Sequence, residues 1–162
     1  GNTFDYTSYG ILAATVSDWA AAKNRTVVHN NNLYQRNTTE NSVGIWNASD
    51  TKRSSHSVVV TDNEIRLQRN GSTGGQQIGV RVMDVDGALI SGNNFRGSAN
   101  RAVDVGSDKF TSDSIDNAIL GNSFGLTTSD ADIYIYPGSR NAVIGSQGAT
   151  YVDAGTNTLV GQ

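Results

Sequence analysis

The fold is decided by the stretch Leu89-Ile90-Ser91-Gly92-Asn93-Asn94-Phe95, in which apolar residues flank a small polar corner that contains asparagine. Three further copies are Val27-Val28-His29-Asn30-Asn31-Asn32-Leu33, Val59-Val60-Thr61-Asp62-Asn63-Glu64-Ile65 and Ala118-Ile119-Leu120-Gly121-Asn122-Ser123-Phe124. The opening Gly1-Asn2-Thr3-Phe4 matches the second half of this phrase, and degenerate copies at 142–146 and 158–162 close the chain. A phrase that returns along the whole chain predicts a repeat architecture.

One asparagine holds the same place in five copies of the phrase. The aligned residues are Asn2, Asn31, Asn63, Asn93 and Asn122, at intervals of 29, 32, 30 and 29 residues. A period near thirty is typical of one coil of a parallel β-solenoid. Asparagine tolerates the left-handed backbone of a sharp corner, and its amide can bond to the same asparagine one coil away. We therefore predict that these five residues form an internal ladder, with the preceding glycines (Gly92, Gly121, Gly145 and Gly161) supplying positive φ.

A second phrase alternates apolar and other residues between the asparagine corners. Its copies are Ile78–Val82, Ala102–Val105 and Asp132–Tyr136, with earlier ones at 10–12 and 44–46. Alternation with a period of two predicts strands with one buried face. The sequence thus predicts an all-β chain, a single-stranded parallel β-helix of about six coils in one domain over 1–162. One short helix is expected to interrupt it at 16–23, with Ser17 as its N-cap.

Composition excludes several classes of protein. The chain has 162 residues, with 12 Lys and Arg against 15 Asp and Glu, so its net charge of −3 argues against a nucleic-acid binder. The absence of cysteine excludes disulfides, cysteine-zinc sites and a thiol nucleophile. No apolar run is long enough for a membrane-spanning helix. The opening Gly1-Asn2-Thr3-Phe4 has no signal-peptide pattern, so we expect a segment of a longer protein.

The asparagine phrase resembles the parallel β-helix repeat of the pectate-lyase-like superfamily. This resemblance covers nearly the whole chain and implies a right-handed helix. The superfamily includes polysaccharide lyases, polygalacturonase-type hydrolases, mannuronan epimerases and phage tailspikes. Its catalytic phrases are missing here, because the sequence contains no D-P-H-D and no N-T-D, G-H-G and R-I-K set.

The resemblance implies a carbohydrate-directed module, extracellular or at the cell surface, that belongs to a polysaccharide-binding or polysaccharide-degrading protein. Two alternatives stay open. One is a complete lyase, hydrolase or epimerase, and the other is a structural spike or surface-repeat protein without catalysis. Fold alone does not decide among them. A polysaccharide is the expected partner, with neither nucleic acid nor a membrane span.

Alternation also predicts a binding column. If the valines and isoleucines of the second phrase point inward, then Trp46, Arg81, Asp104 and Tyr134 point outward, one strand spacing of about 4.8 Å apart. Aromatic rings stack on sugar faces, and an arginine and a carboxylate bind hydroxyl or uronate groups. The alternative is a solvated face on which Arg81 and Asp104 form a weak exposed pair.

Candidate catalytic residues lie near this column. Asp84 and Asp86 follow the strand that carries Arg81, and Asp104 lies one coil further on. Such carboxylates could form an acid/base pair for glycoside hydrolysis, or hold Ca²⁺ for lyase chemistry. The alternative is that aspartate is simply a favoured corner residue. No metal ligands are assigned, and Ca²⁺ is the only cofactor considered.

A further column combines outward positions with apolar residues. Its members are Val27, Val59, Leu89, Ala118 and Ala142. An apolar outer face predicts a cover, either a second copy in a homo-oligomer or a segment of the parent chain. The alternative is that inward and outward positions are reversed near the corner.

Overall fold

The computed structural model describes residues 1–15, 25–36, 41–49, 57–69, 75–106, 114–140, 142–146, 148–156 and 158–161. Every regular element in these ranges is a β-strand, and every pair of neighbouring strands is parallel. The all-β prediction is therefore confirmed for this part of the chain. The helix expected at 16–23 lies outside the described residues.

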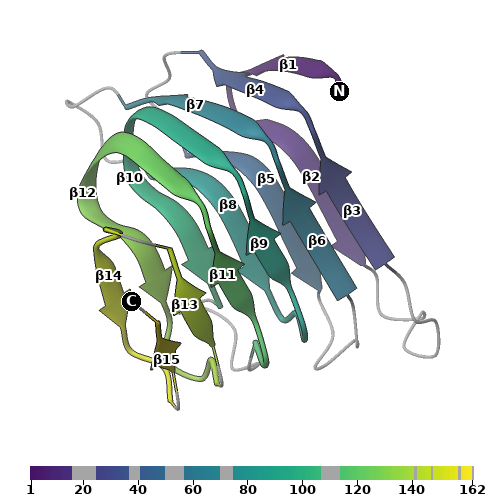
Figure 1. Ribbon diagram of the computed structural model, residues 1–162. Coiled ribbons are helices and arrows are strands. Elements are labelled where there is room, and N and C mark those ends of the chain that lie inside the picture. The colour runs from purple at the N-terminus through teal and green to yellow at the C-terminus, as the bar shows by residue number, and fades with distance from the viewer. Residues whose placement is uncertain are drawn as a thin grey trace.

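The strands form two sheets (Figure 1). The six-stranded sheet has the order β15-β13-β11-β9-β6-β3. Its members are β3 (Arg25–His29), β6 (Ser57–Thr61), β9 (Leu89–Ser91), β11 (Ala118–Leu120), β13 (Val143–Gly145) and β15 (Leu159–Val160). The nine-stranded sheet contains β1 (Thr3–Tyr6), β2 (Tyr9–Thr15), β4 (Asn32–Gln35), β5 (Ser42–Ser49), β7 (Glu64–Gln68), β8 (Gln77–Met83), β10 (Asn94–Val105), β12 (Ser123–Ile135) and β14 (Tyr151–Asp153).

The nine-stranded sheet has two limbs, which the long strands β10 and β12 join by bending (Figure 1). In the first limb, β1, β4 and β7 precede the start of β10, where Asn94–Ser98 pairs with β7. In the second limb, β2, β5 and β8 precede the end of β10, where Arg101–Val105 pairs with β8. One continuous strand thus contributes to both limbs.

Copies of the asparagine phrase lie side by side in register. In the six-stranded sheet Val27 pairs with Val59, Val59 with Leu89 and Leu89 with Ala118. The chain therefore returns to the same place after each repeat, and strands far apart in sequence stack from the N-terminal to the C-terminal end (Figure 1).

This register also builds the core. Like residues meet on neighbouring strands, as where Phe95 and Phe124 stack with ring centroids 5.4 Å apart. The inward column of the six-stranded sheet is Val28, Val60, Ile90, Ile119 and Ile144, and all five are buried. Burying each such side chain contributes about 1.5–3 kcal/mol, so the inward columns supply most of the apolar stabilisation.

The asparagine corner confirms positive φ at two of the four predicted glycines, Gly92 and Gly121. Positive φ falls on the residue before the aligned asparagine, with values of 54° at Asn30, 55° at Asp62, 65° at Gly92 and 59° at Gly121. The aligned asparagines themselves are outside the left-handed region, and so are Gly145 and Gly161. The corner needs one left-handed residue, and placing it before the asparagine leaves the amide free to point inward.

The aligned side-chain amides form a chain of hydrogen bonds. The Nδ2 of Asn31 donates to Oδ1 of Asn63 at 3.1 Å, Asn63 donates to Asn93 at 2.9 Å, and Asn93 donates to Asn122 at 3.0 Å. Asn2 lies at the start of the chain of bonds, with its Nδ2 3.4 Å from Oδ1 of Asn31. Beyond Asn122 the place is taken by Ser146, whose hydroxyl accepts from the Asn122 backbone N–H.

The outward apolar column needs one correction. Val143, and not Ala142, pairs with Ala118, and Ala142 is buried. The prediction was wrong at this position because the corner between Leu120 and Asn122 has one residue more than the matching corner before Ser146. The column thus continues through Val143 to Leu159.

Candidate functional site

The four residues of the predicted binding column are register partners on the second limb. Trp46 on β5 pairs with Arg81 on β8, Arg81 pairs with Asp104 on β10, and Asp104 pairs with Tyr134 on β12. Neighbouring members are therefore one strand spacing apart, and Trp46 and Tyr134 are separated by about 14 Å along the stack.

Asp104 does not lie on a solvated surface, which corrects the weak exposed pair considered as the alternative. Its side chain is 0 % exposed. Arg81 donates to Oδ2 through Nη2 at 2.8 Å and through Nε at 3.2 Å, and Arg101 Nη1 lies 3.4 Å from Oδ1. Burial raises the pKa of the Asp104 carboxyl, while the two guanidinium groups act in the opposite direction.

Arg101 is the central residue of this region. Its Nε donates to Oδ2 of Asp130 at 3.0 Å, and its Nη1 donates to the Tyr136 hydroxyl at 2.5 Å. Its guanidinium carbon lies 3.8 Å from the centroid of the Tyr134 ring, a cation–π contact. Burial, followed by the Asp104 charge, raises the pKa of the Tyr136 phenol, which therefore stays protonated at neutral pH.

We call this group the Arg101 cluster; its members are Arg81, Arg101, Asp104, Asp130, Tyr134 and Tyr136. Sequence reasoning found three of the six and missed Arg101, because strict alternation places Arg101 on the same side as inward Val103. Ala102 and Val103 are consecutive and both are buried in the core, so the alternation breaks between them. As a result Arg101 and Asp104, three residues apart, reach the same outer face.

An aromatic pair extends the column toward the N-terminal end. The Tyr9 and Trp46 rings lie 5.3 Å apart, tilted by 36°. Tyr9 is 45 % exposed, and Trp46 is partly buried with its indole N–H donating to the sulfur of Met83 at 3.3 Å. The contact with Met83 holds the indole in place, while Tyr9 presents an open ring to solvent.

The remaining candidate catalytic residues lie at a corner. Asp84 directly follows β8, is buried and has a φ of 57°. Asp86 lies outside both sheets and pairs with Ile115 in an isolated parallel β-bridge. This geometry is that of a corner residue, and a catalytic role for Asp84 or Asp86 stays a prediction.

The described His, Asp and Glu side chains do not form a cluster that could bind a metal ion. Within the described ranges, no group of three His, Asp or Glu side chains is arranged to hold a metal ion. Both carboxylate oxygens of Asp104 accept hydrogen bonds from arginines, so this side chain is a poor ligand for Ca²⁺.

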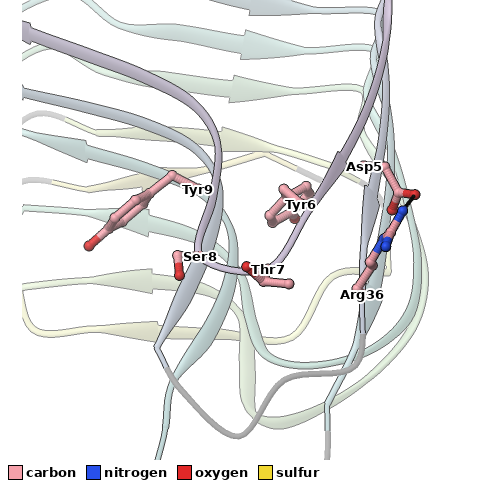
Figure 2. Close-up of a pocket in the computed structure, with 6 residues that line it drawn as sticks. All are labelled: Asp5, Tyr6, Thr7, Ser8, Tyr9 and Arg36. Atoms are coloured by element: carbon pink, nitrogen blue, oxygen red, sulfur yellow. Dashed lines mark hydrogen bonds and ion pairs between the residues drawn. The ribbon is translucent and has the colours of Figure 1, made fainter.

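An open depression of about 600 Å³ lies at the N-terminal edge of the nine-stranded sheet (Figure 2). It is lined by residues 5–9 and by Arg36, whose Nη2 contacts Oδ2 of Asp5 at 2.6 Å. Tyr6 points to the opposite side of β1 from Asp5 (Figure 2). Its hydroxyl is buried with no hydrogen-bond partner, and burial raises the pKa of the Tyr6 phenol. Among the described residues that line this depression, the two charged side chains, Asp5 and Arg36, are already paired with each other.

No described helix has the length and apolarity needed to cross a membrane. Comparison with protein-family models, with curated proteins and with solved structures finds no match to this chain.

Proposed function

We propose that this chain is a right-handed parallel β-helix of about six coils, of the pectate-lyase-like kind, and that it binds carbohydrate. The support for the helix is the in-register return of each repeat and the hydrogen-bonded row of asparagines. The binding surface is the outer face of β5, β8, β10 and β12. Such a module would serve a polysaccharide-binding or polysaccharide-degrading protein, outside the cell or at its surface.

The observation that carries this proposal is a row of aromatic and polar groups on one face. Trp46 and Tyr134 are both partly exposed, in the same column, with the Arg81 side chain between them. Ring faces stack on the C–H faces of sugars, and a fixed guanidinium donates to hydroxyls. A row about 14 Å long matches an extended oligosaccharide lying along the stack.

The charges at this surface indicate which class of sugar it would bind. Arg81 and Arg101 carry two positive charges, and Asp104 and Asp130 carry two negative charges in direct contact with them. Each guanidinium is thus already neutralised by a carboxylate. Such a surface favours hydroxyl groups and ring faces of neutral sugars over the carboxylates of uronic acids.

Replacing the two aromatic residues tests this proposal. We expect Trp46→Ala with Tyr134→Ala to abolish binding on an array of neutral glycans, since each ring contributes about 1 kcal/mol or more beyond its buried area. Tyr151→Ala is the matched control, because Tyr151 is an exposed ring on β14 of the same sheet. Unchanged binding by the double variant, with folding verified by circular dichroism, would remove this surface from consideration.

The enzymatic alternative has less support. A general acid must be reachable by substrate, whereas Asp104 is fully buried beneath two arginines. Incubating the protein with neutral and uronate polymers, while following reducing sugar and unsaturated chain ends, tests turnover directly. A blank result in both binding and turnover, together with a stable trimer by light scattering, would favour the structural spike.

A further inference from the structure

We infer that the outer face of β7 and β10 in the first limb is a second ligand surface, which binds an acidic glycan through Arg66 and Arg96. It lies on a different limb from the Trp46 column, so it goes beyond the function proposed above. The two arginines would receive one carboxylate or sulfate group of the glycan.

The first observation is that two like charges occupy partner positions. Arg66 on β7 and Arg96 on β10 are register partners on neighbouring parallel strands, and both are exposed. Their backbones are therefore about 4.8 Å apart. Like charges directly opposite each other destabilise a sheet unless a counter-charge lies between them.

The second observation is that neither charge is neutralised. Among the residues that the structure describes, no carboxylate lies within ion-pair distance of Arg66 or Arg96, although Glu64 is on the same face. This contrasts with Arg36 on the same limb, which pairs with Asp5, and with both arginines of the Arg101 cluster.

The third observation is that Arg96 is held in place beside open space. With its amide oxygen turned toward Arg96, Asn94 accepts from Nε and Nη2 at 2.9 Å each, which leaves Nη1 free to bind a ligand. The next partner beyond Arg96 is Gly125, which has no side chain to fill the adjoining position. On the other side of Arg66 its partner is Tyr34, an aromatic ring for a neighbouring sugar.

These features together specify the ligand chemistry. Two guanidinium groups with unused donors match the oxygens of a carboxylate or a sulfate. A tyrosine one strand away adds a stacking surface for a sugar ring. The net charge of −3 disfavours a nucleic acid, whose many phosphates require a broad basic face.

Affinity chromatography and titration of the full chain test this inference. The probes are a sulfated glucan, a polyuronate, neutral dextran and single-stranded DNA. We expect the protein to bind the sulfated glucan or the polyuronate with an affinity that weakens as salt is added, whereas binding of dextran at the Trp46 column should not depend on salt. Arg66→Gln with Arg96→Gln should weaken binding about tenfold or more, because charge-assisted hydrogen bonds are lost.

The matched control is Arg36→Gln, which removes one positive charge from the same limb at a site already paired with Asp5. It should leave the affinity within about twofold of the original. The inference is overturned if neither acidic glycan binds, if Arg36→Gln is as harmful as the double variant, or if DNA binds as tightly as the glycans. The Trp46→Ala with Tyr134→Ala variant should keep its acidic-glycan binding, so a failure of the neutral-sugar proposal is separately visible.

Discussion

At the scale of the residue, the buried polar groups carry most of the specificity. Asn63 is 1 % exposed, yet its Nδ2 donates to Thr61 O, Val28 O and Asn93 Oδ1, while its Oδ1 accepts from Asn31. A buried amide with all its groups paired stabilises one corner geometry over others, because any other packing leaves these groups unsatisfied.

Replacing Asn63 with leucine tests this role. Asn63→Leu removes the acceptor of the buried Asn31 backbone N–H and the amide donor to the buried Val28 carbonyl, so we expect a loss of about 3 kcal/mol or more in the free energy of unfolding. The control Asn32→Leu changes an exposed residue of the adjoining corner and should alter that free energy by less than about 0.5 kcal/mol. Denaturant titrations measure both, and equal stabilities for the two variants would contradict an amide ladder.

Asp104 predicts a pH dependence of stability. Because its pKa is raised in the folded protein from the ordinary 3.8, the folded state binds the proton more tightly than the unfolded state. Its contribution to stability is therefore fully present below pH 3.8 and is lost as the pH rises through the raised folded pKa.

Comparison with Asp104→Asn isolates this contribution, since the amide does not titrate. The free energy of unfolding of the native protein minus that of the variant should fall between acid and neutral pH. A difference that instead grows with pH would mean that Arg81 and Arg101 outweigh the burial of the carboxylate.

At the scale of the element, the strands of the second limb need glycine where they lie close to the inward side chains of the first limb. A Cβ on Gly79 would lie 2.6 Å from the Ala102 carbonyl oxygen and 2.7 Å from the Phe95 ring. The neighbouring strands carry Gly10 and Gly44, which meet equivalent carbonyls at 2.6 Å. These three glycines therefore pack against inward side chains of the first limb, which are Leu33, Ile65 and Phe95.

A pair of alanine substitutions tests this packing. Gly79→Ala forces the backbone or Phe95 to move, so we expect a loss of about 1–3 kcal/mol in the free energy of unfolding. Gly125→Ala is the matched change in a strand, because its nearest contact would be the Phe95 carbonyl oxygen at 3.6 Å. It should be neutral or slightly stabilising, as the unfolded chain loses freedom. A thermal melt with both variants unchanged would show that the position of Gly79 tolerates a side chain.

At the scale of the whole molecule, both ends of the stack expose apolar side chains. Val160 pairs with buried Ile144 in an inward column, yet it is 44 % exposed because β15 is the last strand of its sheet among the described residues. At the other end, Ile11 pairs with buried Ile45 in an inward column and is itself only partly buried. Open strand edges with apolar side chains favour association between molecules.

Sedimentation velocity distinguishes the ends from the outward apolar column as the place of association. We expect the chain to self-associate with rising concentration and Val160→Lys to weaken this association. Val143→Lys, on the outer face of the same sheet, should leave it unchanged. The reverse result would assign the contact to the column of Val27, Val59, Leu89, Ala118 and Val143.

Much of the architecture could be read from the spacing of a few residues. The recurrence of Asn31, Asn63 and Asn93 near every thirtieth position predicted parallel strands in register, because each repeat must bury its apolar face on the next. The pairing of Trp46, Arg81, Asp104 and Tyr134 followed from the same periodicity.

The periodicity could not predict which side chains are buried or which side chains they contact. Alternation specifies to which side a residue points, and it placed Asp104 outward, but whether water reaches that side depends on long side chains from other strands. Arg101 contacts Asp104 because Ala102 and Val103 are both buried in the core, which turns the residues on either side of them to the outer face. Spacing along the chain established the repeat, since every repeat obeys the same backbone geometry; tertiary packing alone decided which charges are neutralised and which, like Arg66 and Arg96, stay open to a ligand.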